Sequence, residues 1–461
     1  MSRKLLTDDG VIFISISEDE VTNLKYICNE VFGEACLVTV LHVELSATQG
    51  MKVKAAQNGN IVKNAEYILV YSKDGHKNIA NRIMYDYRSE YDGHYTKYLS
   101  DEFEVLNLID VYNSANPKNP IQNVVNGYAS EPVFREFVES HLDHIFRYDK
   151  TTGFQAEDFD IGKVVRVERD GKSYTIERKK TGVEQLMFLS SSYGYCDNFR
   201  KSFGLRKIRG DWWKEFYLDM GNVSKEVSIV FANGKKPVRL IEQLCKMCTC
   251  NDDIVMDFFS GSATTAHAVM NANVEDLGKR KCILVQLPEE CDDKSEFNTI
   301  CELGKERIRR TGQKIKENDP LLTQDLDVGF RVFKVDDSNM NDVYYSADEY
   351  SQGLLSSLES NVKADRTYLD LLFGCLLEWG LPLSLPYSSE EIEGCTVHNY
   401  NDGDLIACFD ENVPDSVIKE IAKRKPLRAV FRDSSFANSP SKINVSEICK
   451  LVAPDTRVKV I

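Results

Sequence analysis

The hydrophobic pattern of the chain begins with a short strand followed by an amphipathic helix. Residues 10–17, GVIFISIS, are mostly β-branched and apolar, which predicts a buried strand. Residues 18–33 carry apolar positions at helical spacing and end at Gly33, so they predict a helix with a glycine stop. We expect Ser17 to cap this helix, with Glu20 as the second member of a capping box.

The rest of the first 75 residues continues this pattern. CLVTVLHVEL and AEYILVYSK predict two more strands. The polar residues 46–64 between them contain glycines and predict a loop. Residues 1–75 thus predict part of an α/β sheet, and residues 1–10 predict the end of a helix that precedes it.

The pattern changes between residues 76 and 220. Tyr, Asn, Asp and Arg are frequent there, and KVVRVERDGKSYTIERKK predicts a hairpin that turns at Asp170 and Gly171. Alternating strands and helices return in residues 221–335, which include RKCILVQLPE and FNTICELGKERIRRTGQKIKE. Residues 345–461 predict a further α/β segment, with a helix in YLDLLFGCLLEWGL. We therefore expect an insert within an α/β core, followed by a C-terminal α/β domain.

Composition restricts the class of protein. The chain has 461 residues and a formal charge of −15, from 57 Lys and Arg against 72 Asp and Glu. This balance argues against a general polyanion binder but leaves room for a local basic cleft. No apolar run reaches the roughly 20 residues that a membrane span needs, and the N-terminus has no signal-peptide pattern. We expect a cytoplasmic protein without a membrane partner.

The thirteen cysteines indicate a reducing compartment, because most of them are expected to be small buried residues. The tightest group is Cys245, Cys248 and Cys250, and no histidine lies near it in the sequence. We therefore expect no zinc site and no other metal.

Residues 254–269, IVMDFFSGSATTAHAV, predict a strand, a turn of small residues and a helix. Asp257 stands at the strand end, and the helix begins near Thr264. A ligand can approach such a backbone closely and bind the free N–H groups of the helix. The turn lacks the lysine that a P-loop requires, and it has only one of the glycines of a dinucleotide-binding pattern. S-adenosylmethionine is the remaining common ligand, and a tight connection without any ligand is the alternative.

The residues around this turn resemble a known family. NGKKPVRLIEQLCKMCTCNDDIVMDFFSGSATT joins a Lys-Pro-x-x-Leu-Ile helix to Asp-Phe-Phe-Ser-Gly-Ser, and it resembles the cofactor site of DNA amino-methyltransferases of the β arrangement. In that group the catalytic half comes first, a target-recognition insert follows, and the cofactor half comes last. LLTDDGVIFISISEDEVTNLKYICNEVFGE, DMGNVSKE, RVFKVDDSN and RAVFRDSSF are similar to the modification subunit of type III restriction–modification systems.

The resemblance implies a fold and a domain order. It implies an α/β protein with a Rossmann-like methyltransferase sheet, an inserted target-recognition domain and a C-terminal α/β domain. Residues 1–75 and 221–335 would form the two parts of the methyltransferase core. Residues 76–220 would recognise the DNA target, and residues 345–461 would serve assembly. A nicotinamide-dependent dehydrogenase does not fit the glycine pattern of the turn.

The resemblance also implies cofactor-binding residues. The turn would line the methionine part of S-adenosylmethionine, one helix would cover it, and the end of the next strand would lie near the ribose and adenine. Glu289 would accept hydrogen bonds from the ribose hydroxyls, and the alternative is a solvated loop acid. Lys236 would belong to the helix that covers the cofactor, and the alternative is a surface lysine. Ala263 stands where the family usually has glycine, so we expect weakened binding at most. The implied set is Lys236, Pro237, Leu240, Asp257, Phe258, Phe259, Ser260, Gly261, Ser262, Ala263, Thr264, Thr265, Gln286, Leu287, Pro288 and Glu289.

The catalytic motif of this family is not found in the sequence. These enzymes bind the target amine with a loop of the form [DNS]-Pro-Pro-[Tyr/Phe], whereas no two of the twelve prolines here are adjacent. In the family the loop lies upstream of LLTDDGVIFISI, which begins here at residue 5. We therefore expect an incomplete subunit, or one completed by a second polypeptide, and name no catalytic residue. We also expect an exposed sheet edge and a protein that aggregates or depends on a partner.

Residues 198–216, NFRKSFGLRKIRGDWWKEF, are the best candidates for contact with DNA. Basic side chains contact phosphates and base edges, whereas the aromatic residues fit a core equally well. A second basic set lies on the predicted hairpin, where it alternates with acids and indicates a solvated face. The candidates are Arg200, Lys201, Arg206, Lys207, Arg209 and Trp212.

The resemblance implies an activity and partners. The intact enzyme would transfer a methyl group from S-adenosylmethionine to adenine N6 of a flipped base in double-stranded DNA. Its partners would be the restriction subunit and a second modification subunit. The alternative is an inactive DNA-recognition and assembly fragment that binds a restriction subunit or a second methyltransferase polypeptide.

Overall fold

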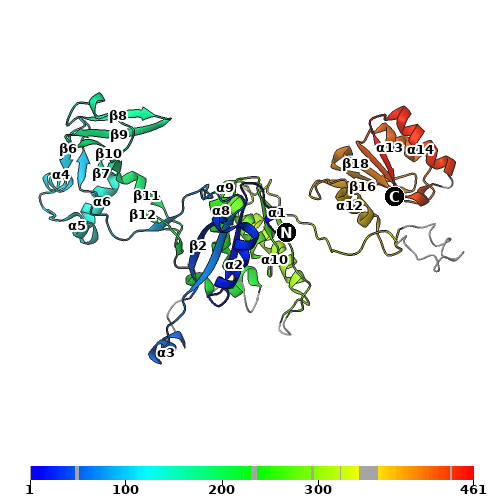
Figure 1. Cartoon of the computed structure of the whole chain (residues 1–461), viewed down its shortest axis with the longest axis horizontal. Helices are drawn as coiled ribbons and strands as arrows, with labels where there is room; N and C mark the ends of the chain where they lie inside the picture. Colours follow the sequence, from blue (N-terminus) through cyan, green and yellow to red (C-terminus); the bar gives the residue numbers. More distant parts are fainter. Residues whose placement is uncertain are drawn as a thin grey trace. The chain divides into compact units, whose positions relative to one another are not determined.

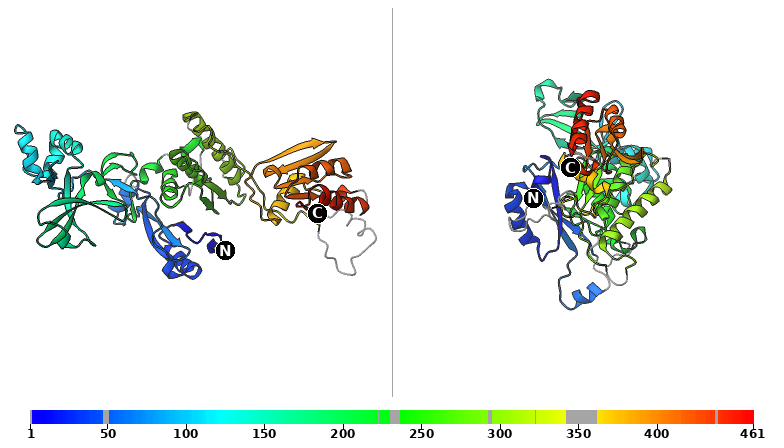
Figure 2. Two further views of the ribbon diagram at one scale, coloured as in Figure 1. Left: turned by 90° about the horizontal axis from the view of Figure 1, so that it is seen from above. Right: turned by 90° about the vertical axis from the view of Figure 1, so that its right-hand side faces the viewer.

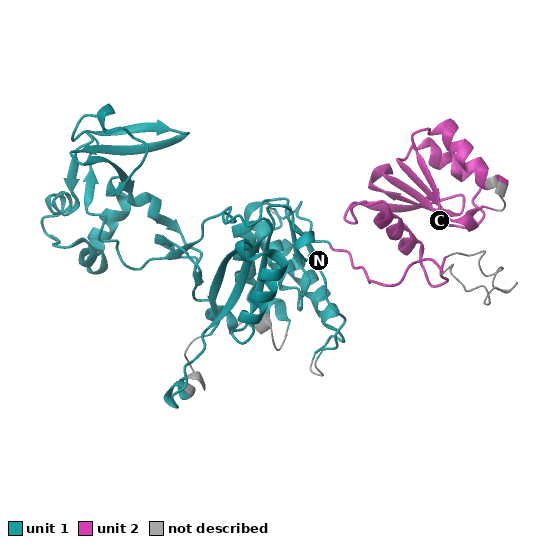
Figure 3. Ribbon diagram, viewed as in Figure 1, with its two compact units in different colours: residues 1–329 teal, residues 330–461 magenta. Residues whose placement is uncertain are grey.

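The computed structural model describes residues 2–46, 51–221, 223–229, 236–291, 295–321, 323–341, 362–436 and 439–461. The chain divides into two compact units, residues 1–329 and 330–461 (Figure 3). The expected insert and the expected methyltransferase core up to residue 329 lie in the first unit, whereas residues 330–335 of that core and the expected C-terminal domain lie in the second.

A four-stranded sheet is the centre of the first 75 residues (Figure 1). Its order is β1-β3-β2-β13, and all neighbours are antiparallel except β13, which runs parallel to β2. Helix α2 covers one face and α8 covers the other, because successive residues of β3 alternate between the two cores. The elements are α1 (Ser2–Leu5), β1 (Val11–Ile16), α2 (Val21–Phe32), β2 (Leu37–Glu44), α3 (Met51–Gln57), β3 (Ala65–Ser72), β13 (Trp212–Trp213), α7 (Tyr217–Met220), the 3-10 helix η4 (Val223–Ser228) and α8 (Val238–Cys248).

Two local predictions in this region are wrong. Glu20, not Ser17, is the residue before α2, and no side chain caps the helix. The Glu20 carboxylate instead accepts a hydrogen bond from Asn23 at 3.0 Å, so the capping box does not form. The stretch 46–64 is not all loop, because α3 occupies part of it.

Residues 76–220, the expected insert, contain a six-stranded antiparallel sheet, a three-stranded antiparallel sheet and the short helices α4, α5 and α6. The predicted hairpin is confirmed: β8 and β9 pair, and Asp170 and Gly171 both have positive φ, as a tight two-residue turn requires. The elements are β4 (Tyr85–Tyr87), β5 (Lys97–Leu99), β6 (Val105–Asn107), α4 (Leu108–Ala115), α5 (Val124–Ser130), α6 (Pro132–Ser140), β7 (Ile145–Lys150), β8 (Val164–Arg169), β9 (Lys172–Lys179), β10 (Gly182–Phe188), β11 (Tyr193–Tyr195) and β12 (Phe203–Ile208).

The expected cofactor half has a small sheet of its own. Its elements are β14 (Ile254–Asp257), α9 (Thr264–Asp276), β15 (Lys281–Leu284) and α10 (Ile300–Asn318). Among the described residues, β14 and β15 pair only with each other, in parallel, and Figure 2 shows them as a sheet separate from the blue strands β1–β3. Helix α8 connects the two parts because it packs against both the four-stranded sheet and α9.

One face of the β14–β15 sheet is open. Cys282 and Leu284 pack toward α9 and α10, whereas the alternate residues point the other way. On that other face Ile254 is 61% exposed, Met256 40% and Ile283 48%. Parallel sheets are usually covered on both faces, so this apolar face is unusual for a folded α/β core.

The second unit is a five-stranded sheet in the order β16-β17-β18-β19-β20, antiparallel over its first three strands and parallel over its last three. Helix α12 covers one face, and α13 and α14 cover the other. The elements are α12 (Tyr368–Glu378), β16 (Tyr387–Ile392), β17 (Cys395–Tyr400), β18 (Leu405–Cys408), α13 (Asp415–Lys423), β19 (Arg428–Phe431), α14 (Ser439–Val452) and β20 (Arg457–Val460). In the described part of the chain, no helix is long and apolar enough to cross a membrane.

Candidate cofactor-binding and DNA-facing sites

Asp257 fixes the turn between β14 and α9. Its Oδ1 accepts the backbone N–H of Phe259 at 3.1 Å, and its Oδ2 accepts the hydroxyl of Thr265. One carboxylate therefore holds both ends of the turn, which is a physical reason for an aspartate at this strand end.

The end of β15 holds the same turn from the other side. Ser260 donates its N–H to the carbonyl of Val285 at 3.2 Å, and Gly261 donates its N–H to Oε1 of Gln286 at 2.7 Å. The resemblance implies a place near the ribose and adenine for Gln286, which stays a prediction; in the structure its side chain binds the turn backbone.

The turn has the features that a small polar ligand requires. Gly261 has φ +49°, and a Cβ built on it meets no atom within 4 Å, so the space above it is open. Ala263 precedes α9 with φ +60°, and no side chain caps the helix. The first N–H groups of a helix have no acceptor within it, and those of α9 have no side-chain cap. Such a helix start fits a ligand that carries an anionic or hydroxyl group.

The alanine at position 263 does not narrow this open space. Its side chain is 2% exposed and packs with Ala266 and Ile308 in the core beneath the turn. The alanine therefore lowers stability only because a non-glycine residue adopts a left-handed backbone there, which costs on the order of 1–2 kcal/mol.

The residues expected on the covering helix have different roles in the structure. Leu240 is 1% exposed and packs on the four-stranded sheet, not on the turn. Pro237 is buried immediately before α8. Lys236 forms an ion pair with Glu66 at the start of β3, so it links the two halves of the core and is not a free surface lysine.

The remaining expected residues border the turn at the surface. Phe259 is 85% exposed and Leu287 67%, while Phe258 is 40% exposed. Pro288 and Glu289 are exposed in the loop after β15. These side chains lie at the carboxyl end of the parallel strands, where α/β proteins bind ligands.

Sequence reasoning missed Arg307 of α10. Its side chain is fully buried and donates to the hydroxyl of Ser262 in the turn at 3.1 Å. The sequence did contain a signal for this burial. Leu303 and Thr311 lie one helical turn to either side of Arg307, and this spacing places all three on the buried face of α10.

The predicted DNA-contacting residues divide into two groups. Arg200, Lys201 and Lys207 are exposed on and before β12. Arg206 is half-buried, with its guanidinium 4.0 Å from the ring centroid of Tyr85. Exposed apolar residues accompany them on the same three-stranded sheet and its flank: Tyr87, Tyr195, Phe203 and Ile208.

Trp212 is 45% exposed and stacks on His42 with ring centroids 5.9 Å apart. It lies on β13, at the junction of the insert with the four-stranded sheet. The neighbouring Trp213 is 2% exposed, so one tryptophan of the pair belongs to the core and the other faces outward.

Arg209 is an interior residue. Its side chain is 1% exposed, and its Nε donates to Asp86 at 2.7 Å. The same guanidinium donates to the side chain of Gln243 at 2.6 Å and to the carbonyl of Asp197 at 3.1 Å. Its position therefore favours a structural role at the root of the insert over contact with DNA.

Three basic residues on and beside the β8–β9 hairpin have partners within residues 76–220. Lys163 pairs with Asp160 at 2.8 Å, and Lys179 pairs with Glu184 at 2.8 Å. Arg169 donates to the carbonyl of Gly153 at 2.5 Å. This pairing agrees with the solvated face that the alternation of charges had predicted.

A cavity of 590 Å³ lies at the amino end of β14, opposite the turn. Its buried cations have partners, because Lys246 pairs with Glu275 and Arg280 pairs with Asp276 at 2.7 Å. These ion pairs leave Lys246 and Arg280 with acidic partners inside the protein.

Two cysteines beside that cavity stand three residues apart on α8, in a Cys-x-x-Cys spacing. Burial raises the pKa of Cys245 to about 12 and that of Cys248 to about 12. A reactive or metal-binding pair needs thiolates, so burial opposes that chemistry here.

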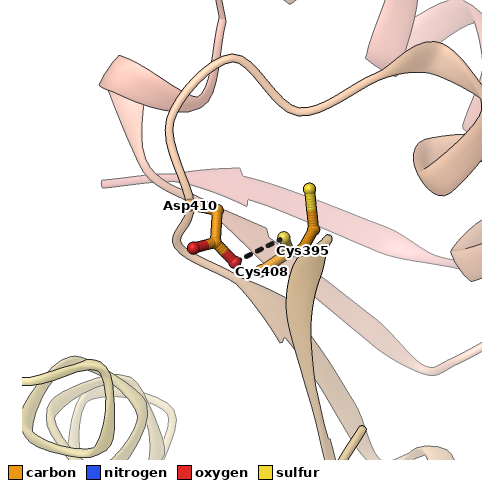
Figure 4. Close-up of side chains that lie close together, drawn as sticks. All are labelled: Cys395, Cys408 and Asp410. Atoms are coloured by element: carbon orange, nitrogen blue, oxygen red, sulfur yellow. Dashed lines mark hydrogen bonds between the residues drawn. The ribbon is translucent and has the colours of Figure 1, made fainter. Parts of the chain in front are cut away.

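A group of described residues in the second unit has the spacing of metal ligands. The ligand atoms of Cys395, Cys408 and Asp410 lie within 4.8 Å of one another (Figure 4). Both carboxylate oxygens already accept hydrogen bonds, from the Tyr368 hydroxyl at 2.9 Å and the Thr396 N–H at 2.5 Å. Burial also raises the pKa of the Cys408 thiol to about 12. We interpret the cluster as part of the core of this unit.

The comparisons with known proteins find a DNA methylase family model and similar proteins that are restriction-modification Mod subunits or a methyltransferase. A family model described as DNA methylase matches residues 2–291. The chain is 27% identical to the type III restriction-modification enzyme EcoP15I Mod subunit of Escherichia coli, over 98% of this chain and 70% of that protein. It is 27% identical to the StyLTI Mod subunit of Salmonella typhimurium, over 72% and 46% of the two chains, and 26% identical to the type II methyltransferase M.KpnI of Klebsiella pneumoniae, over 62% and 64%. The chain thus spans 46–70% of the length of these relatives.

Proposed function

The chain belongs to the DNA methylase family, and from this premise we propose that it is the modification subunit of a type III restriction–modification system. Family membership confirms the class of enzyme that the Lys-Pro-x-x-Leu-Ile and Asp-Phe-Phe-Ser-Gly-Ser motifs had indicated. The similarity to Mod subunits supports the finer assignment to type III systems.

The turn between β14 and α9 is the proposed site of S-adenosylmethionine, and its geometry is the observation that carries this proposal. The cofactor would supply an electrophilic methyl group on a sulfonium. The open space above Gly261 and the uncapped N–H groups of α9 would bind its polar groups. Asp257 and Gln286 would hold the turn in that shape, because both bind its backbone.

The insert would bind the duplex. Arg200, Lys201 and Lys207 are exposed, so they would contact phosphates despite the net negative charge of the chain. Arg206 and the exposed aromatic residues of the same sheet are the candidates for contact with bases. The target adenine would turn out of the helix toward the cofactor.

Assembly is the proposed role of the second unit. It has a complete core of its own and no second nucleotide-binding turn among its described residues. Its proposed partners are the restriction subunit and a second modification subunit, in the cytoplasm.

A second candidate function is DNA recognition and assembly without methyl transfer. No two prolines are adjacent in the 461 residues, so the [DNS]-Pro-Pro-[Tyr/Phe] loop that binds the target amine is not encoded in them. In this case the chain would bind cofactor or DNA, and a second methyltransferase polypeptide would supply the loop.

Calorimetric titration with S-adenosylmethionine, together with transfer of a tritiated methyl group to duplex DNA, tests the proposal. We expect binding without transfer. Transfer by the purified chain would show that the catalytic residues lie within it. Absence of both binding and transfer, in a cooperatively folded sample, would contradict the proposed cofactor site.

Replacing Gly261 with alanine is expected to weaken binding of S-adenosylmethionine at least ~10-fold, about 1.4 kcal/mol. The added Cβ would point into the open space above the turn. Gly171→Ala is the matched control, because Gly171 also has a positive φ and no atom within 4 Å of a built Cβ. Both variants should lose about 1 kcal/mol of stability in urea titrations. Equal cofactor affinity in the two variants would contradict the site.

A further inference from the structure

Arg307 is a buried cation that no sequence motif indicated. Its side chain is 0% exposed. One terminal nitrogen donates to the Ser262 hydroxyl at 3.1 Å, and the other donates to the Glu226 carboxylate at 2.7 Å. It also lies 3.5 Å from Nδ1 of His267 in α9. A single guanidinium therefore contacts the turn, α9 and η4 at once.

Glu226 extends this connection to α8. Its other carboxylate oxygen accepts the backbone N–H of Val238, the first residue of α8, at 3.3 Å. Arg310, one helical turn after Arg307, adds a second link because it donates to the carbonyl of Ser228 at 3.0 Å. The Arg307–Glu226 pair thus joins the turn to the helix that begins immediately after Lys236 and Pro237.

The contact with Ser262 bears on the shape of the turn. Ser262 is 3% exposed and lies between Gly261 and Ala263, both of which have left-handed backbones. Ser262 accepts a hydrogen bond from Arg307, and its Oγ lies 3.4 Å from Oγ1 of Thr264. A buried, charge-assisted hydrogen bond at this residue holds the backbone on both sides of it.

We propose that Arg307 is a positioning residue of the cofactor site. Through Ser262 it fixes the turn, and through Glu226 it holds the turn at a constant distance from the start of α8. The proposal rests on the proposed function, namely that this site binds S-adenosylmethionine. It assigns no catalytic step to Arg307.

The decisive variant is the double substitution Arg307→Met with Glu226→Leu. Removing one partner of a buried pair leaves an uncompensated charge, whereas replacing both with apolar residues is often neutral for folding. We expect the double variant to melt cooperatively near the parent temperature but to bind S-adenosylmethionine at least ~10-fold more weakly in calorimetry. Arg309→Met, at an arginine of the same helix whose side chain is 60% exposed, should bind like the parent.

Parent-like cofactor affinity in a folded double variant would overturn the proposal. If the double variant fails to fold, Ser262→Ala decides, because it removes the acceptor in the turn and leaves the ion pair in place. It should weaken cofactor binding severalfold and lower the melting temperature modestly, because one nitrogen of the buried Arg307 loses its acceptor. Unchanged affinity would overturn the proposal.

Amide hydrogen exchange separates this proposal from the proposed function. If the parent itself binds no S-adenosylmethionine, the function fails and the positioning role is still measurable. The peptide covering residues 258–263 should then exchange faster in Ser262→Ala and in the double variant than in the parent and in Arg309→Met. Equal exchange in all four proteins would overturn the positioning role.

Discussion

Arg209→Ala is expected to destabilise the chain by about 3–5 kcal/mol, because it breaks a buried ion pair and leaves its partners without compensation. The side chain is 1% exposed and binds Asp86, Gln243 and the carbonyl of Asp197. These partners come from β4, from α8 and from the segment before β12, so the guanidinium joins the root of the insert to the core. Urea denaturation of the parent and the variant measures the loss.

Lys207→Ala is the matched control, because Lys207 lies on β12 and Arg209 immediately follows that strand. Lys207 is exposed, so its loss should change stability by no more than about 0.5 kcal/mol. It should weaken DNA binding and reduce the salt dependence of binding by about one phosphate contact. If Arg209→Ala instead kept full stability and lowered the salt dependence, Arg209 would contact DNA and the structural assignment would be wrong.

Substitution of Ile254 and Ile283 by lysine is expected to convert a self-associating chain into one that sediments as a single species. Both side chains lie on the open face of the β14–β15 sheet, at 61% and 48% exposure. The strands also offer unpaired edges within the described residues, and such edges promote pairing between chains. Charged side chains on that face would oppose contact with a second apolar surface. Sedimentation velocity at increasing concentration measures the change.

Ile443→Lys with Leu451→Lys tests whether the effect belongs to this face. Those residues are 64% and 83% exposed on α14 of the second unit, and their substitution should leave self-association unchanged. A parent chain that is a monodisperse, cooperatively melting monomer would contradict the expectation that the open face of the β14–β15 sheet causes self-association.

The sequence by itself determined the elements whose signal is local. Strands β1, β2 and β3 follow from short apolar stretches that are rich in β-branched or aromatic residues. The hairpin at Asp170 and Gly171 follows from turn residues that tolerate positive φ. The turn after Asp257 was also predictable, because a strand end, small residues and a helix start occur within ten positions. Contacts within a few residues determine these features, so a single sequence contains the information.

Only the tertiary structure decided which charged residues are buried. Arg206, Lys207 and Arg209 look equivalent in the sequence, yet Lys207 is exposed and Arg209 is interior. The partners that bury Arg209 lie 34 and 123 positions away, at Gln243 and Asp86. Arg307 is similar, because Ser262 and Glu226 reach it from 45 and 81 positions away.

The tertiary structure also decided how the strands are grouped. Local patterns predict that β1 and β14 are strands, but pairing depends on which strand lies next to each in space. The described residues place them in two sheets, with α8 as the connection and an apolar face left open. Burial and pairing are properties of segments brought together from distant parts of the chain, and no local pattern of residues specifies them.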